Sequence, residues 1–411
     1  MAIKPFKEFL DDVSKAKLDT LAPHAATKVK ESSSLEEMRN HILSHYKGVE
    51  VQHSFVDANG SVFDCVPVEQ QPSLQGKGAP AKAPDLPMEK QPAGATDDRK
   101  AKQIEAPLGA GKKDSLGNAM ECPDGTIPLR RLRLEDMSRF ENLHQFFQKS
   151  PVGNEVTPPK IEKPTVATHR WAHAFQNVNN LGGHSYLNVW DPAIGANQIF
   201  SLTQHWYVGS SSAGTQTAEC GLQVYPGLYG NTHPCLFIYW TADGYNKTGC
   251  YNLSCNAFTQ TNKNWTLGGA VGPVSIYGGQ QYELFLAYYL SGGLWWFYVG
   301  GGASANAIGY YKASQYGSGT MATHAVEIDY GGETVGTTSW PGMGSSHFAN
   351  QGWQKAAYQR DIESFPTTGG AVIASLTPSQ QWPQCYTATV TKFNPPWNET
   401  LFFGGPGGTN C

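Results

Sequence analysis

The distribution of tryptophan and charge divides this chain of 411 residues into two unlike parts. All 11 tryptophans lie after residue 170, whereas only 7 of the 30 basic and 10 of the 34 acidic residues occur from residue 165 onward. A region rich in aromatic residues and poor in charge has a large core to bury, whereas a charged and weakly hydrophobic region does not. The sequence therefore predicts a well-packed C-terminal domain preceded by a polar N-terminal region.

Short runs of aromatic and β-branched residues recur through the C-terminal part, separated by Gly, Asn and Pro. They lie at 186–190, 200–208, 219–225, 236–241, 282–289, 294–299, 324–330, 371–374 and 387–392. No helical period of ten or more residues interrupts them. Many short strands with glycine-rich turns favour an antiparallel sandwich or barrel over a parallel α/β sheet. We therefore expect an all-β C-terminal domain.

The first 69 residues have the pattern of a small α+β unit. Ser34 and Glu37 have the spacing of a capping box, and apolar residues follow at helical spacing. Asn59 and Gly60 then lie between two β-prone runs, which is a strong signal for a hairpin. A short charged helix is expected from about residue 134 to 147.

Composition sets the expected boundaries. Residues 70–118 are rich in Pro, Gln, Lys, Gly and Ala and contain no aromatic residue, so they cannot bury enough surface to order themselves. Residues 150–164 contain four prolines and form a second linker. The expected organisation is an α+β unit at 1–69, a flexible linker at 70–118, a final N-terminal segment at 119–149, a processing linker at 150–164 and a β-sandwich at 165–411.

Charge and hydropathy exclude several classes of partner. The net charge of −4 gives no basic footprint for nucleic acid, and no apolar run approaches the ~18–20 residues of a membrane helix.

The first 11 residues lack the apolar core of a signal peptide. Eight cysteines, an even number, favour a secreted protein whose signal peptide is absent from this chain, and the monomer is the expected state. Glycosylation sequons occur at Asn59, Asn246, Asn252, Asn264 and Asn398.

Several stretches resemble, in order, the neprosin family of glutamic peptidases. They are GHSYLNVWD at 183–191, FSLTQHW at 200–206, ECGLQVYPGLYG at 219–230, YWTADGY at 239–245, TGCYNLSC at 248–255, YGGE at 330–333, MGSSHF at 343–348 and KAAYQR at 355–360. Residues 64–66, 71–72 and 122–131 resemble the activation peptide of that family. Tyr330 and Leu222 stand where tryptophan is common in the family, and Cys220 and Cys235 are additional.

The resemblance implies a sandwich of two antiparallel sheets, a propeptide that inhibits the enzyme, and acid-optimal cleavage of proline-containing substrates after proline. Its two catalytic glutamates correspond to Glu219 and Glu333. It also implies the disulfides Cys250–Cys255 and Cys385–Cys411. The pairs Cys220–Cys235 and Cys65–Cys122 remain guesses among 105 connectivities.

The residues themselves are compatible with this chemistry. A carboxylate inside an apolar strand needs a task or a partner, and Glu219 shares one strand face with Gln223. Two close carboxyls cannot both ionise easily, so such a pair shares a proton at acid pH. Gln223 and Tyr239 are candidates to assist an oxyanion. Glu327 and Asp329 share the strand parity of Glu333 and are its rivals.

Other kinds of site are less well supported. His347 follows two serines but no G-x-S-x-G elbow, and the histidines and cysteines lack metal-ligand spacing, so we expect neither a metal nor a cofactor. A carbohydrate-binding or glycoside-hydrolysing sandwich is one alternative, and a catalytically inactive binding domain is another. A charged N-terminal region on proline-bearing linkers favours a removable inhibitor. The prolines of the second linker predict a processed form that begins between Val152 and Thr165.

Overall fold

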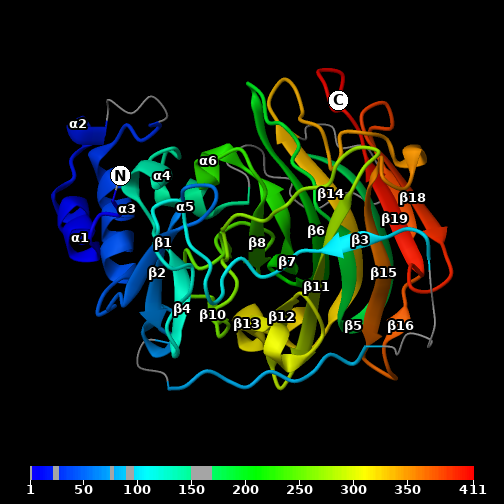
Figure 1. Ribbon diagram of the computed structural model, residues 1–411, viewed down its shortest axis with the longest axis horizontal. Coiled ribbons are helices and arrows are strands. Elements are labelled where there is room, and N and C mark those ends of the chain that lie inside the picture. Colours follow the sequence, from blue (N-terminus) through cyan, green and yellow to red (C-terminus); the bar gives the residue numbers. More distant parts are fainter. Residues whose placement is uncertain (1, 22–26, 75–77, 89–96, 150–168) are drawn as a thin grey trace.

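A computed structural model gives the fold, and it describes residues 2–21, 27–74, 78–88, 97–149 and 169–411. A small N-terminal unit lies beside one end of a much larger assembly of strands (Figure 1). The expected processing linker at 150–164 lies outside the described residues. Within the part of the chain that the structure describes, no helix is both long and apolar enough to cross a membrane.

The N-terminal unit packs helices on a three-stranded sheet. The hairpin predicted at Asn59 and Gly60 is present, and its strands form the antiparallel order β1-β2-β4. The helix predicted from the capping box is also present but begins at Ser32, without a side-chain cap. The elements up to residue 149 are α1 (Phe6–Lys15), α2 (Leu18–Leu21), α3 (Ser32–His45), β1 (His53–Val56), β2 (Val62–Pro67), β3 (Ala101–Gln103), β4 (Thr126–Arg130), α4 (Leu134–Met137) and α5 (Leu143–Phe147). Two short helices, α4 and α5, therefore replace the single helix expected at 134–147.

The C-terminal domain is built almost entirely of antiparallel strands. They are β5 (His169–Asn188), β6 (Gln198–Ser211), β7 (Gly214–Val224), β8 (Cys235–Thr241), β9 (Cys250–Tyr251), β10 (Phe258–Gln260), β11 (Gln281–Ser291), β12 (Leu294–Val299), β13 (Ala307–Lys312), β14 (Ala325–Gly336), β15 (Ala357–Pro366), β16 (Val372–Ile373), β17 (Thr377–Gln380), β18 (Thr387–Lys392) and β19 (Glu399–Gly404). One short helix, α6 (Pro226–Tyr229), follows β7. The all-β expectation for this domain is confirmed.

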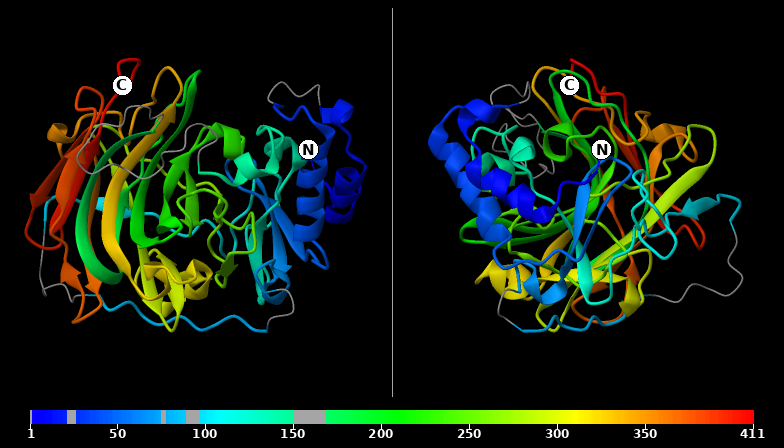
Figure 2. Two further views of the ribbon diagram at one scale, coloured as in Figure 1. Left: turned by 180° about the vertical axis from the view of Figure 1, so that it is seen from behind. Right: turned by 60° about the vertical axis from the view of Figure 1, so that its left-hand side comes forward.

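Strand β5 connects two layers of this domain. Its first half pairs with β14, which continues through β6, β7 and β8, and its second half pairs with β11 and β15. The layers meet through side chains on β6: the Tyr207 hydroxyl donates to the Gly183 carbonyl at 2.6 Å, and His205 is 2.7 Å from the Ser185 hydroxyl. The expected sandwich is thus one curled sheet that folds onto itself through β5 (Figure 2).

A glycine permits the change of layer. Gly182, near the middle of β5, has φ +132°, and a Cβ atom there would lie 2.0 Å from the carbonyl oxygen of Tyr288 on β11. No residue with a side chain fits so close to a neighbouring backbone. The close approach at Gly182 lets β5 pass from one layer to the other without losing its hydrogen-bonded neighbours.

Residues of the segment 70–118 are ordered against the C-terminal domain in the described ranges. Leu86 packs in a cluster with Trp296 and Tyr298, and its backbone amide donates to the carbonyl of Gly302. Further along, β3 pairs with β11. The composition of this segment gives it no core of its own, so it uses a surface provided by another domain.

The cysteines form three disulfides and leave two free thiols. The bridges are Cys65–Cys122, Cys250–Cys255 and Cys385–Cys411. The guess that Cys220 and Cys235 pair is wrong. In the antiparallel β7–β8 register Cys220 lies opposite Ile238 and Cys235 lies opposite Gln223, so the two thiols are three positions apart and cannot reach one another.

The free thiols give the first prediction. Unfolding the chain without reductant should expose two thiols per molecule to a thiol reagent, and the native protein should expose none. Both side chains are fully buried, and burial raises the pKa of the Cys235 thiol to about 12, which removes the reactive thiolate. Counting labelled cysteines by mass spectrometry measures this, and a chain without any reactive thiol after unfolding would contradict it.

Candidate functional site

Glu219 and Glu333 lie on the same face of the sheet, on strands separated by one other strand. Glu219 is on β7 opposite Trp206 of β6, and Glu333 is on β14 opposite Leu202 of β6. Neighbouring strands are about 4.8 Å apart and same-face residues recur every second position. The two glutamates therefore lie diagonally across β6 from one another, with their backbones two strand spacings apart and opposite β6 positions that differ by four residues.

Gln204 occupies the position between the two glutamates. It lies on β6 midway between Leu202 and Trp206, and its cross-strand neighbours on both sides are glycines, Gly221 on β7 and Gly331 on β14. Glycine leaves no side chain next to the amide. The neighbouring backbones pack closely there, since a Cβ atom would lie 2.0 Å from the Thr203 carbonyl oxygen at Gly221 and 2.5 Å from the Ala172 carbonyl oxygen at Gly331. The buried amide of Gln204 lies within reach of both carboxylates.

A lysine from the end of the N-terminal region joins the two glutamates. The Lys149 ammonium is 2.6 Å from Glu219 Oε2 and 2.8 Å from Glu333 Oε2, and all three side chains are fully buried. Its Nζ also lies 4.8 Å from the centre of the Trp206 ring. We call Lys149, Glu219 and Glu333 the ion triad. It blocks the position that any third group would need to touch both carboxylates.

The charges of the triad support one another. Burial lowers the pKa of the Lys149 ammonium, but the two carboxylates outweigh burial and keep that pKa above its ordinary value. Burial raises the pKa of the Glu333 carboxyl, but Lys149 and His169 together outweigh it and hold that pKa below its ordinary value. A buried ion pair persists only when each charge has such a partner. Removing the ammonium would leave two buried carboxylates facing one another.

The two glutamates differ in their remaining partners. Glu219 Oε1 accepts hydrogen bonds from the hydroxyls of Thr217 at 2.7 Å and Tyr245 at 2.6 Å. Glu333 Oε1 instead contacts the ring Nδ1 of His169, the first residue of β5. Hydroxyls are neutral donors, whereas an imidazole can carry a positive charge. Glu219 therefore has neutral donors as its remaining partners, whereas Glu333 lies beside an imidazole.

The Gln204 amide completes the site. In the orientation that gives every neighbour a complementary group, its oxygen accepts from Lys149 Nζ at 2.9 Å and from Trp206 Nε1 at 2.6 Å, and its nitrogen donates to Glu219 Oε2 at 3.2 Å. In the opposite orientation the nitrogen donates to Glu333 Oε2 at 3.3 Å. In the satisfied orientation the amide oxygen of Gln204 therefore faces the ammonium and the amide nitrogen faces Glu219.

Two tyrosines hold the backbone that carries Lys149. The Tyr239 hydroxyl donates to the Phe147 carbonyl at 3.1 Å, and the Tyr251 hydroxyl donates to the Lys149 carbonyl at 2.9 Å. Gln223, a candidate assistant, bonds the hydroxyls of Tyr229 and Tyr251 and contacts neither glutamate. The structure thus places Tyr239 beside Glu219, directly opposite it on β8, and places Gln223 away from the pair.

The rival carboxylates lie outside the triad. Asp329 is on the same face of β14 but is bonded to His173 Nδ1 at 2.8 Å. Glu327 lies two positions before Asp329 on β14, farther from Glu333 and opposite Val208. Neither residue contacts Lys149 among the described interactions. In the part of the chain that the structure describes, no cluster of His, Cys, Asp or Glu is arranged to hold a metal ion.

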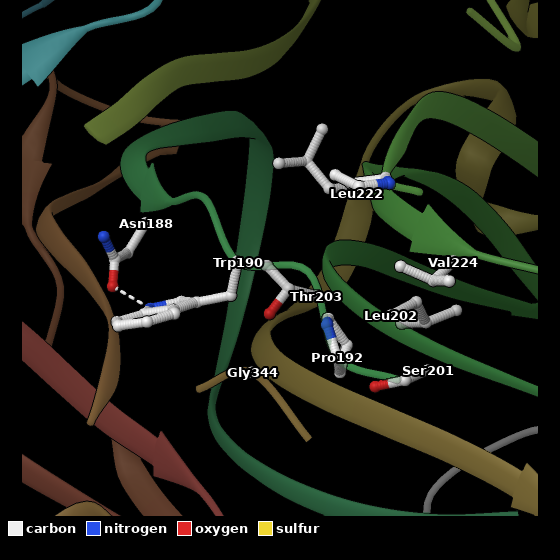
Figure 3. Close-up of a pocket in the computed structure, with 10 residues that line it drawn as sticks. Asn188, Trp190, Pro192, Ser201, Leu202, Thr203, Leu222, Val224 and Gly344 are labelled. Atoms are coloured by element: carbon white, nitrogen blue, oxygen red, sulfur yellow. Dashed lines mark hydrogen bonds between the residues drawn. The ribbon is translucent and has the colours of Figure 1, made fainter. Parts of the chain in front are cut away.

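A small cavity near β6 does not belong to this site (Figure 3). It has a volume of about 20 Å³, and Thr203, Leu222 and Val224 in its lining have the opposite strand parity to Gln204 and Glu219. The buried hydroxyls of Ser201 and Thr203 have no hydrogen-bond partner among the described residues. The volume suits a single water that would satisfy them, so the cavity is a structural feature.

Sequence comparison identifies the family. The model of the neprosin family matches residues 197–406, which include both glutamates, and the model of the neprosin activation peptide matches residues 54–177, which include Lys149. This chain belongs to the neprosin family. It is a peptidase precursor with an activation peptide, and the lysine between the glutamates comes from that peptide.

The solved structures to which the fold is similar include two peptidases. One is scytalido-glutamic peptidase with a transition state analog inhibitor, at 8% identity over 58% of this chain and 98% of that chain, with a TM-score of 0.33. Another is SCP-B, a member of the Eqolisin family, in complex with the tripeptide Ala-Ile-His, at 8% identity over the same shares, with a TM-score of 0.29.

Substituting Lys149 tests the importance of the ion triad. We expect Lys149→Met to weaken docking of the activation peptide by about 3–5 kcal/mol, because two buried carboxylates lose their cation. Precursor processing, followed on denaturing gels, should then occur at a less acidic pH than in the unsubstituted chain. Lys113→Met, at an exposed lysine of the same region, is the matched control. Identical processing of the Lys149 and Lys113 variants would show that the triad does not keep the precursor latent.

Proposed function

We propose that this chain is the secreted zymogen of a glutamic endopeptidase that cleaves proline-containing polypeptides after proline, with Glu219 and Glu333 as its catalytic pair. The observation that carries the proposal is the ion triad, in which a lysine of the activation peptide forms ion pairs with two buried glutamates. Secretion is supported by three disulfides, which persist in oxidising compartments. The preference for proline rests on the family resemblance.

The surroundings of the two glutamates assign them different tasks. Glu333 is the general base, because His169 favours its ionised form after Lys149 has left. Glu219 is the general acid, because its remaining partners are the neutral hydroxyls of Thr217 and Tyr245. Two carboxyls that share one proton divide the roles according to which environment favours the charge.

The reaction then needs no group from outside the site. Glu333 takes a proton from water as the water oxygen bonds to the scissile carbonyl carbon. Glu219 hydrogen-bonds the carbonyl oxygen and then gives its proton to the leaving nitrogen as the carbon–nitrogen bond breaks. The Gln204 amide nitrogen donates to Glu219 Oε2 and holds that carboxyl in place, while the amide oxygen accepts from Trp206 Nε1. Proton transfer from Glu333 to Glu219 restores the starting state.

Latency and activation follow from the same contacts. With Lys149 in place, neither glutamate can hold the shared proton and no substrate carbonyl can enter between them. Lys149 is followed by the linker at 150–164, which lies outside the described residues, and we propose that cleavage occurs there after acidification.

The direction of the pH effect follows from Glu333. Its pKa in the docked precursor lies below the ordinary value of 4.5. Ionised Glu333 therefore stabilises docking, and this stabilisation is lost as the pH falls through the lowered pKa. Asp136 adds an acid-labile contact inside the N-terminal unit itself: burial raises the pKa of its carboxyl, but Arg130, Arg133 and Arg139 outweigh burial and hold that pKa below its ordinary value.

Isosteric substitution of each glutamate tests the catalytic proposal. Acid-treated wild-type chain should cleave a proline-containing peptide after proline, whereas Glu219→Gln and Glu333→Gln should each lose at least about 10²–10⁴-fold in kcat/KM, because an amide cannot exchange the proton. An added protease can process variants that do not process themselves. Product masses identify the cleaved bond.

The matched control is Asp329→Asn, on the same face of β14. This variant should keep activity within a few-fold of wild type, because Asp329 pairs with His173 instead of the triad. Wild-type turnover by a folded Glu219→Gln or Glu333→Gln variant would remove that residue from the mechanism. Cleavage at bonds unrelated to proline would overturn the specificity and leave the catalytic pair intact.

The role of His169 predicts a shift of the pH profile. His169→Phe keeps an aromatic ring stacked on Trp171 and removes the hydrogen bond to Glu333. The pKa of Glu333 should then rise, so the limb of kcat/KM on the acid side should move to higher pH while the alkaline limb stays. Measuring kcat/KM from pH 2 to 8 checks this. A uniform loss of activity without a moved limb would assign His169 a purely structural role.

A further inference from the structure

A second part of the activation peptide lies against the peptidase domain, away from the ion triad. We call residues 97–104 the strap. Its strand β3 (Ala101–Gln103) pairs in parallel with residues 281–283 of β11, and the Ile104 amide donates to the Glu283 carbonyl at 2.9 Å. This strand lies far from the helices of the N-terminal unit (Figure 1). The strap therefore binds as an extended added strand.

The strap places an arginine on two aromatic rings. The Arg99 guanidinium carbon lies 3.7 Å from the centre of the Phe393 ring and 4.8 Å from that of Trp397. Trp397 Nε1 also donates to the Arg99 carbonyl at 3.3 Å. A cation over aromatic faces contributes from about 0.5 kcal/mol when exposed to about 2 kcal/mol when desolvated. The peptidase domain thus contacts both the side chain and the backbone of this residue.

Four residues later, the strap reaches a buried carboxylate. The Gln103 amide donates to Glu283 Oε1 at 2.5 Å, and Glu283 is also held by the Arg360 guanidinium and by the Tyr358 hydroxyl at 2.9 Å. Arg360 in turn donates to the Pro396 carbonyl, next to Trp397. The arginine position and the amide position are therefore parts of one continuous surface, joined through Arg360.

Release of the activation peptide uncovers this surface. The strand edge at 281–283 then loses its partner and the rings of Phe393 and Trp397 lose their cation, and such edges readily accept another extended chain. The strap itself demonstrates the complementary ligand: an extended segment with an arginine and, four residues later, an amide side chain. Its backbone hydrogen bonds would be the same for any sequence, whereas the rings select the cation.

We propose that this surface is a second peptide-binding site of the processed enzyme, and that it holds an extended, arginine-bearing segment of a protein substrate while another segment enters the catalytic cleft. The proposal rests on the proposed endopeptidase function, because an endopeptidase binds extended polypeptide chains as its substrates. It adds a recognition element distant from the scissile bond. Protein substrates would gain affinity from it, and short peptides would not.

Binding is tested first on the full-length chain, without any need for activity. The probe is a fluorescent peptide with the sequence of residues 97–105, DDRKAKQIE, which contains no proline. The variant Arg99→Ala with Gln103→Ala weakens the chain's own strap, so the peptide should bind it at least about tenfold more tightly than it binds wild type. A peptide with alanine in place of its arginine is the matched control and should bind at least about fivefold more weakly. Equal binding of the two peptides, or no binding to either form of the chain, would overturn the site.

The processed enzyme, separated from its activation peptide, tests the function of the surface. The DDRKAKQIE peptide should inhibit cleavage of an arginine-containing protein substrate and leave cleavage of a short proline-containing peptide unchanged. Phe393→Ala should raise KM for the protein about fivefold or more with an unchanged kcat. Inhibition of neither substrate would limit the surface to docking the activation peptide and overturn the proposal. If the processed chain cleaves nothing, the proposed function fails, and the binding result on the full-length chain still stands on its own.

Discussion

One ammonium between two buried carboxylates determines the state of this molecule. Glu219 and Glu333 are fully buried in the precursor, so they cannot both carry charge there without a nearby cation. Lys149 provides that cation in the precursor, and a proton provides it in the working enzyme that we propose. The two cations exclude one another, because both occupy the space between the same oxygens. In the function that we propose, latency depends on which positive charge fills this one position.

Much of the sandwich and the two glutamates could be predicted from the sequence. The hairpin at Asn59 and Gly60, the all-β domain and the likeness to neprosin-type glutamic peptidases all rest on local patterns or on contiguous motifs. Lys149 could not be found in this way. It is one lysine of a charged region, and its partners lie 70 and 184 residues away on strands whose register the sequence does not state. Gln204 and His169 were missed for the same reason, although Gln204 is part of a stretch that carries the family resemblance.

The other differences between expectation and structure have a common cause as well. Residues 70–118 were expected to be a linker because they have no core of their own, and yet β3 and Leu86 use the surface of the peptidase domain. Cys220 and Cys235 are close in sequence on paired strands but three positions out of register. Strand β5 runs for 20 residues where a short strand at 186–190 was expected. In each case long-range pairing, which local composition does not state, decided the outcome.

The position of β6 between the glutamate-bearing strands affects which parts of this protein can vary in evolution. The separation of the two carboxyls is fixed by two hydrogen-bonded ladders in the centre of the sheet and not by any loop. Insertions in the turns, or variation of the exposed surface, leave that separation untouched. Damage to the geometry requires opening of the central ladders, which are among the last parts of a domain to open before global unfolding. A sheet that sets the distance between its working groups in this way frees its loops to diverge toward new substrates while the chemistry stays constant.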